Sequence, residues 1–202
     1  MIRPLVLAAA LAFAGPAFAQ DAPLKTAPAA APPLAGGPAP APPAGAPKKP
    51  PTLVQALIAA GFDPHTKLTG DTVQVMSGQR AILAVGGAKP VLEAVETGHV
   101  DIALPDGAPD TYKAVAPGKV AFAVDGSAAK KQSFLKIWNG LPHAVSYEAE
   151  LTAIRGGKLA KRKAQVCAVP GGGTNYETWS DPIIAVTLSK VVEVADDKIT
   201  CK

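Results

Sequence analysis

The histidines that could carry acid–base or metal chemistry are scattered along the chain. His65, His99 and His143 lie in three separate segments, and none has the spacing of a paired metal ligand such as H-x-x-x-H. The G-x-S-x-G nucleophile elbow of many serine hydrolases is absent from the sequence. We therefore expect no cofactor and no metal ion, and an enzyme is not the favoured interpretation. A small hydrolase that uses His143 or His99 with nearby carboxylates is an alternative.

Three aspartates are close enough in sequence to converge on a cation. They are Asp101, Asp106 and Asp110. Asp106-Gly107 and Pro109-Asp110 are also ordinary turn dipeptides, and the spacing does not match a calcium-binding EF-hand loop. We favour the turn interpretation over a calcium site.

The segment 169–182 has the composition of a binding loop. Three glycines allow a close approach of the backbone to a partner, and tyrosine and tryptophan are frequent anchors of binding sites. The candidate binding residues are Gly171, Gly172, Gly173, Thr174, Asn175, Tyr176 and Trp179. The structural alternative, which we favour, is that the aromatic residues cover the end of the domain. Trp138, beside Asn139-Gly140, has the same two interpretations.

The two cysteines, Cys167 and Cys201, are predicted to form a disulfide. An exported chain enters an oxidising compartment, where a pair of cysteines is more often bridged than free. A bridge that closes about 35 residues would contribute roughly 3.5 to 4 kcal/mol in the chain-entropy model. No histidine lies within ligand spacing of either cysteine, which argues against a zinc site.

A basic run follows the clearest strand of the sequence. Residues 144–154 alternate between apolar and polar side chains, which predicts a half-buried strand, and Gly156-Gly157 predicts a two-residue hairpin loop. In that register Ala149 opposes Ala164, Glu150 opposes Lys163 and Thr152 opposes Lys161. The hairpin tip forms a candidate basic patch of Arg155, Lys158, Lys161 and Arg162.

The remaining elements are short. Thr52 and Gln55 fit a capping box, which predicts a helix that ends near Gly61. The segment 90–96 fits either a strand or a helix with proline in its first turn. Short β-branched runs separated by turn residues predict strands at 72–76, 80–85, 91–96, 100–104, 119–124, 132–138, 183–188 and 191–194.

These elements predict an all-β domain over residues 52–202, a mainly antiparallel two-layer sandwich of immunoglobulin-like kind. A small β-barrel or an α+β fold is the alternative. Residues 1–19 have the cationic start, apolar run and Ala17-Phe18-Ala19 site of a signal peptide. Residues 20–51 hold eleven prolines among many alanines and glycines, which predicts a disordered tether.

The charge distribution limits the kinds of partner. The whole chain has 20 basic and 16 acidic residues, but residues 52–202 have 16 and 15, so the domain itself is nearly neutral. We expect no nucleic-acid partner and no integral membrane segment. The sequence predicts an exported, periplasmic or extracellular, non-catalytic module that binds a protein or a cell-envelope glycan. A structural protein that organises the envelope through the basic patch is a further alternative.

Overall fold

The structure is a two-layer β sandwich. The computed structural model describes residues 51–201, so the predicted leader and nearly all of the predicted tether lie outside the described residues. Its helices and strands are α1 (Leu53–Ala59), β1 (Lys67–Thr69), β2 (Thr72–Met76), β3 (Gln79–Ala84), β4 (Val91–Thr97), η1 (Asp101–Ala103), β5 (Lys119–Ser127), β6 (Gln132–Asn139), β7 (Ala144–Arg155), β8 (Lys158–Ala164), β9 (Thr174–Trp179), β10 (Ile183–Val194) and η2 (Asp196–Lys198).

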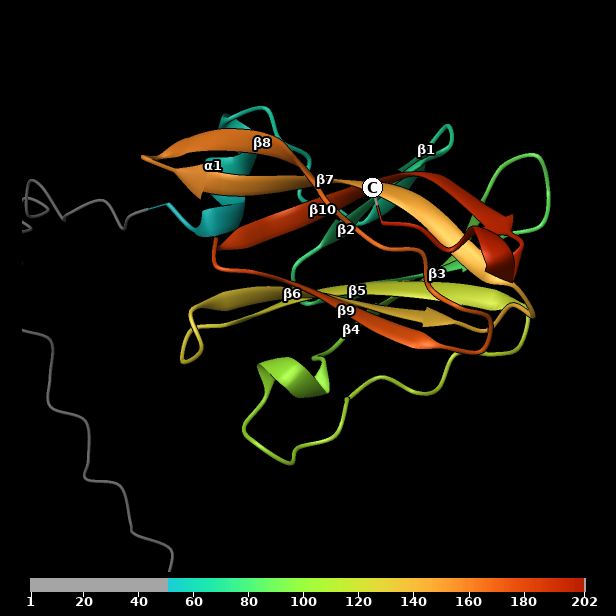
Figure 1. The fold of residues 1–202 in the computed structure, drawn as a ribbon. Coiled ribbons are helices and arrows are strands. Elements are labelled where there is room, and N and C mark those ends of the chain that lie inside the picture. Colours follow the sequence, from blue (N-terminus) through green and yellow to red (C-terminus); the bar gives the residue numbers. More distant parts are fainter. Residues whose placement is uncertain (1–50, 202) are drawn as a thin grey trace, which may run out of the picture. The chain divides into compact units, whose positions relative to one another are not determined.

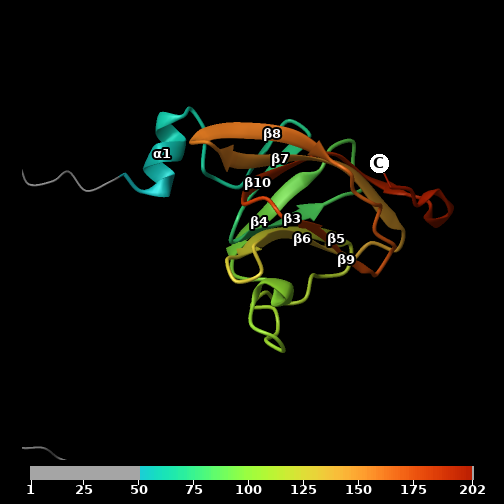
Figure 2. The same cartoon turned by 60° about the vertical axis from the view of Figure 1, so that its left-hand side comes forward.

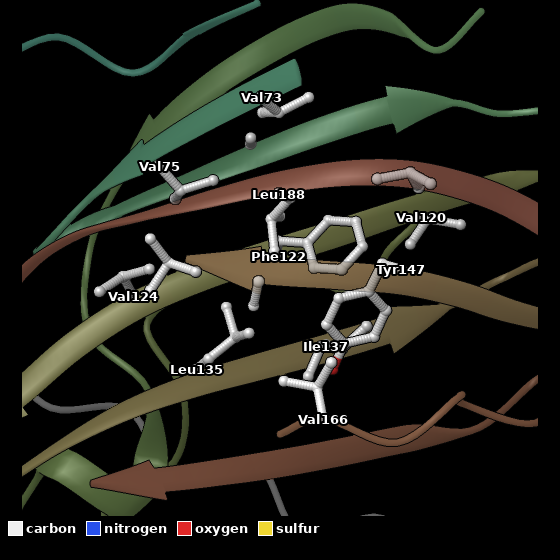
Figure 3. Close-up of a cluster of buried hydrophobic side chains, with 14 of the residues drawn as sticks. Val73, Val75, Val120, Phe122, Val124, Leu135, Ile137, Tyr147, Val166 and Leu188 are labelled. Atoms are coloured by element: carbon white, nitrogen blue, oxygen red, sulfur yellow. The ribbon is translucent and has the colours of Figure 1, made fainter. Parts of the chain in front are cut away.

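Two antiparallel sheets of five strands face each other, which confirms the predicted sandwich (Figure 1). Sheet A has the strand order β1-β2-β10-β7-β8, and sheet B has the order β4-β3-β5-β6-β9. Their facing sides form one apolar core. At its centre the ring of Tyr147 from sheet A meets the ring of Phe122 from sheet B edge to face at 5.3 Å (Figure 3). Such a T-shaped contact is a preferred geometry for aromatic pairs.

The predicted capping box forms at the start of α1. The Thr52 hydroxyl accepts a hydrogen bond from the Gln55 N–H, and the Gln55 side chain accepts one from the Thr52 N–H. Gly61 has a φ of 75°, the left-handed conformation that ends a helix. Leu57 is the buried residue of this helix, and α1 lies beside the tip of the β7–β8 hairpin in both views (Figures 1 and 2).

The β7–β8 hairpin has the predicted register. Ala149 pairs with Ala164, and Arg155 pairs with Lys158 across the turn. Gly156 and Gly157 have φ values of 57° and 74°, as a primed two-residue turn requires. The alternation of residues 144–154 therefore predicted the strand and its register. The prediction of a half-buried strand was wrong in part, because Ser146 and Thr152 on its polar face are also buried.

Three predicted elements differ from the structure. Residues 100–104 form η1 and a loop rather than a strand, because Asp101 accepts the Ile102 N–H and starts a 3-10 turn. Residues 174–179 form the edge strand β9 rather than a loop. The two strands predicted at 183–188 and 191–194 form a single strand, β10, with a register shift between Ser189 and Val192. The segment 90–96 is a strand, β4, and not a helix.

The predicted disulfide joins Cys167 to Cys201. The two cysteines also form an antiparallel bridge between their backbones, and the Ala168 N–H donates to the Thr200 carbonyl oxygen at 3.1 Å. Cys167 lies in the segment that leads from β8 in sheet A to β9 in sheet B. The bridge therefore fastens the C-terminal residues to the crossing between the two sheets.

Candidate ligand-binding groove

The connection between β4 and β5 lies across the outer face of sheet B. We call residues 98–118 the strap; it contains η1 and lies on the side of sheet B that faces away from sheet A (Figures 1 and 2). Val100 and Tyr112 of the strap pack on Ala123 and Phe134 of the sheet in a second apolar cluster. The strap therefore covers a face that would otherwise be exposed to solvent.

Polar contacts fix the strap at three points. The Val100 N–H donates to the buried carboxylate of Asp125 at 3.0 Å. Arg80 Nη1 donates to the Lys113 carbonyl oxygen at 2.7 Å, and Lys130 Nζ donates to the Ile102 carbonyl oxygen at 2.7 Å. Side chains of strands and of the β5–β6 turn thus hold the strap against the sheet near its start, at Val100 and Ile102, and again at Lys113.

Lys136 of β6 is a buried cation beneath the strap. Its side chain is 5% exposed, and Nζ lies 2.6 Å from Asp110 Oδ2 and 3.0 Å from Asp101 Oδ1. Burial alone would lower the pKa of Lys136, but hydrogen bonds with Asp110, Tyr176 and Asp101 outweigh burial and raise it. The ammonium group is therefore a fixed positive charge that draws the two strap aspartates onto the sheet.

Arg80 of β3 is the second buried cation on this face. Its side chain is 1% exposed, and Nε and Nη2 lie 2.9 and 2.5 Å from the Glu96 carboxylate. The Cα register aligns Glu96, Arg80, Ala123, Lys136 and Tyr176 across the five strands of sheet B. One row of the sheet therefore carries two cations, separated by the small side chain of alanine.

Three aromatic rings surround these cations. Arg80 lies 4.7 Å from the Tyr112 ring centroid and 5.1 Å from that of Trp138. Lys136 lies 5.1 Å from the Trp138 centroid and 4.8 Å from that of Tyr176. Cation–π contacts of this kind are worth about 0.5–2 kcal/mol each, more when water is excluded. The arrangement holds Trp138 in place between two charges.

A groove of about 560 Å³ opens where the strap meets the β6 and β9 end of this face. The strap forms one wall and the residues before β9 form the other, with Trp138 between them. Its lining residues are Asp110, Tyr112, Lys113, Ala114, Val115, Pro117, Trp138, Asn139, Gly140, Gly172, Gly173 and Thr174. The groove therefore combines aromatic side chains with polar groups and exposed backbone, as ligand sites commonly do.

Two of the three glycines before β9 have structural reasons within the domain. A Cβ on Gly171 would overlap the carbonyl group of Pro142. Gly172 has a φ of 65°, which favours glycine, and its N–H donates to the Leu141 carbonyl oxygen at 3.0 Å. The close backbone approach that we expected toward a partner is thus made to the β6–β7 turn, and it shapes one wall of the groove.

The structure separates the side chains of the candidate binding loop. Thr174 lines the groove, and Tyr176 lies on the same outer face beside Lys136. Trp179 lies on the opposite face of β9 and packs against the main core. Tyr176 and Trp179 therefore do not form one surface, and Trp138 takes the place of Trp179 at the groove.

Glu177 lies on the inner side of β9 near the disulfide. Its Oε1 accepts the Cys167 N–H at 3.2 Å and the Asn175 amide at 3.3 Å. Burial raises the pKa of Glu177, and the hydrogen bond from Cys167 offsets part of that effect. These residues close the side of the sandwich and do not reach the groove.

Three cations of the basic patch form ion pairs with two carboxylates, Asp181 and Glu150. Arg155 and Arg162 lie 2.7 and 3.1 Å from the same carboxylate oxygen of Asp181. Lys161 lies 3.1 Å from Glu150, its diagonal neighbour on the outer face of sheet A. Lys158 is exposed at the turn.

Two of the three aspartates that could have bound a cation do converge, on the ammonium group of Lys136. Asp106 instead points to solvent, 3.8 Å from Lys130. Within residues 51–201, no cluster of three or more His, Cys, Asp or Glu side chains is arranged to hold a metal ion. In the strap, Asp101 and Asp110 therefore bind the ammonium group of Lys136.

His99 is paired with Asp125, and Nδ1 lies 3.2 Å from Oδ2. The hydrogen bonds described for its ring go to this carboxylate and to no hydroxyl or thiol group. His65 pairs with Asp63 in an exposed loop, and the His143 carbonyl oxygen accepts from the Asn139 amide. The Thr111 hydroxyl contacts the backbone of His99, accepting its N–H at 2.6 Å, and is not a described partner of the ring.

Sequence reasoning missed Lys136, Arg80 and Tyr112. A signal for the first was present, because Lys136 is the single charge in the otherwise apolar run Phe134 to Trp138. A cation inside a strand of this kind indicates either an exposed face or a buried ion pair. No comparable pattern marks Tyr112, which lies in an irregular loop.

Among residues 51–201, no helix has the length and apolar character needed to cross a membrane. The disulfide fits a compartment outside the cytoplasm. Comparison of the chain with protein-family models, with curated proteins and with solved structures finds no match.

Proposed function

We propose that this protein is an exported, non-catalytic module that binds a glycan in the groove beside the strap. The observation that carries the proposal is the groove itself, in which Trp138 is held between two buried cations. A ring that is already fixed loses little conformational freedom when a ligand contacts it. The groove is therefore preorganised for binding.

The chemistry of the lining suits a sugar ring. A pyranose has C–H groups on one face and hydroxyls at its edge. The C–H groups pack on aromatic rings, whose faces are electronegative. The exposed hydroxyl of Thr174, the ammonium group of Lys113 and the backbone near Gly172 can bind the hydroxyls. A volume of about 560 Å³ lies within the usual range for small-molecule sites.

The same lining supports binding without hydrolysis. Glycoside hydrolases generally use two carboxyl groups that flank the bond to be cleaved. Asp110 is the carboxylate among the described residues of the groove, and its side chain is bound to Lys136 and to the Asp101 N–H. Its charge is therefore used to hold the strap.

Export and display on the tether complete the proposal. The Cys167–Cys201 bridge supports export, because disulfides persist in oxidising compartments. The proline-rich composition of residues 20–51 supports an extended spacer between the leader and the domain.

A matched pair of substitutions on β9 tests the groove. Thr174 and Thr178 are both exposed on the outer face of this strand, but only Thr174 lines the groove. Thr174→Trp fills the groove with an indole, whereas Thr178→Trp adds the same bulk four residues away. Both variants of the full chain are compared with the unchanged protein by calorimetric titration with chitohexaose, cellohexaose and maltohexaose.

We expect at least one oligosaccharide to bind the unchanged protein and the Thr178→Trp variant with similar Kd. Thr174→Trp should weaken that binding at least tenfold, which corresponds to about 1.4 kcal/mol. Equal affinity in both variants would place the ligand elsewhere. No heat of binding to any of the three probes at millimolar concentration would refute the glycan as the ligand class.

A further inference from the structure

We propose that the edge strand β8 forms a second interaction surface, which binds a linear acidic polysaccharide. The charge distribution is the first observation. Residues 155–163 hold five cations, which are Arg155, Lys158, Lys161, Arg162 and Lys163. The rest of residues 52–202 holds 11 basic and 15 acidic residues, so the remainder of the domain is net negative.

The fold aligns these cations along one free edge. β8 is the last strand of sheet A, and it pairs with β7 on one side only. Lys161 and Lys163 belong to the outer face, where they oppose Thr152 and Glu150, whereas Arg162 opposes the core residue Leu151. Cations therefore flank both sides of the exposed backbone. On the outer face Lys161 and Lys163 are two residues apart, roughly 6.6–6.8 Å, and on the other face Lys158 and Arg162 are four residues apart.

Internal ion pairs neutralise only part of this charge. Asp181 is shared by Arg155 and Arg162, and Glu150 pairs with Lys161. Two carboxylates thus face five cations, and the paired side chains of Arg155, Lys161 and Arg162 remain 58%, 56% and 44% exposed. An excess of three positive charges remains available to an anionic partner.

Protection of the sheet edge does not account for this concentration. Lysine on an edge strand commonly prevents pairing with another chain. β4 and β9 are also edge strands of six residues or more, and their sequences contain no lysine or arginine. The described domain therefore leaves two comparable edges without cations and places four on β8, with Arg155 beside them at the end of β7.

A linear polymer fits this surface better than a membrane. The hairpin tip is Gly156-Gly157 and carries no large apolar side chain; the exposed apolar side chains near it, Leu53, Val54 and Ile58, belong to α1 and not to β8. The cations follow a strand and do not spread over a flat face. Carboxylate groups along an extended sugar chain can contact several of them in succession.

Polygalacturonate is the anionic probe. Neutral dextran is the control for a polymer without charge, and vesicles of phosphatidylglycerol are the control for an anionic membrane. Lys158→Gln with Lys163→Gln removes two cations that form none of the ion pairs described above, so the Asp181 and Glu150 pairs stay in place. Lys89→Gln with Lys131→Gln is the matched control, because both residues are exposed and the net charge changes equally. Affinity is measured on the full chain at low and at physiological salt.

We expect polygalacturonate to bind the unchanged protein, with affinity that falls as salt rises. The β8 pair of substitutions should weaken binding roughly tenfold at low salt, and the control pair less than twofold. Equal losses in both pairs would show a net-charge effect and overturn the proposal, as would equal binding of dextran or binding of the vesicles alone. Thr174→Trp should leave polygalacturonate binding unchanged, so this test is independent of the groove.

Discussion

Replacing Lys136 with methionine removes the ammonium group that holds the strap on sheet B. Methionine keeps the length and most of the volume of the side chain, so the apolar contacts beneath the strap are retained. The carboxylates of Asp101 and Asp110 are then left close together without a cation. Breaking a fully buried ion pair costs about 3–5 kcal/mol.

The expected cost is smaller here because one partner is solvated. The Asp101 side chain is 40% exposed and that of Asp110 is 19% exposed, so water screens part of their repulsion. We expect Lys136→Met to lower the free energy of unfolding by about 2–3 kcal/mol. For a domain of this size the melting temperature falls by roughly 5–10 °C.

Urea unfolding followed by circular dichroism measures this change. A triple variant that adds Asp101→Asn and Asp110→Asn to Lys136→Met removes the uncompensated charges and should recover more than half of the loss. A loss below about 0.5 kcal/mol in the single variant would refute the buried-cation argument. So would a triple variant that is no more stable than Lys136→Met.

The acid limb of the stability curve provides a second readout of the same network. Burial opposes ionisation of Asp101, but hydrogen bonds from Lys136 and from the Ile102 N–H outweigh burial and hold its pKa below the ordinary value. Because the folded pKa is the lower one, this stabilisation is present above about pH 4 and is lost as the pH falls through the folded pKa. Lys136→Met should make that acid loss shallower.

Three further changes test the disulfide, the buried glutamate and the glycine wall. Cys201→Ser should lower stability by up to about 4 kcal/mol in urea unfolding, and an equal midpoint with and without reductant in the unchanged protein would contradict a bridge to Cys167. Burial raises the pKa of Glu177, so its charge costs stability as the pH rises through the unfolded and then the folded pKa. Glu177→Gln should therefore flatten the stability curve above about pH 4, where the unfolded glutamate ionises, and an unchanged slope would exclude this group as its source. Gly171→Ala should cost about 1–3 kcal/mol through overlap with Pro142, and native stability would refute that contact.

The glycan proposal and the polyanion proposal rest on different surfaces of the molecule. The groove belongs to the outer side of sheet B, and the cations belong to an edge of sheet A. Each test uses substitutions that the other surface does not contain. Failure of one therefore leaves the other unaffected.

The β7–β8 hairpin could be predicted because its determinants are local. Alternation places Ala149 and Leu151 on the core side, and two glycines at the turn allow positive φ. β9 could not be predicted in the same way. Its core-facing residues include Asn175 and Glu177, so the strand has polar side chains on both faces and shows no hydrophobic period.

Residues 100–104 were wrongly predicted as a strand for a related reason. Val100 and Ile102 are β-branched, but their partner is the outer face of sheet B rather than a neighbouring strand. Side-chain hydrogen bonds to Asp101 and Asp125 hold the backbone there. Tertiary contacts thus override the local β preference.

The sequence by itself predicted a β-rich domain, the hairpin register and the pairing of the two cysteines, because these depend on alternation, turn glycines and the number of thiols. The choice of a sandwich over a barrel or an α+β fold came from the tertiary structure. Only the tertiary structure decided that Lys136 is buried and that Trp138, rather than Trp179, lines the groove. Both outcomes depend on where residues 98–118 pack. The position of a long connection is set by contacts with strands distant in sequence, and a local pattern does not report such contacts.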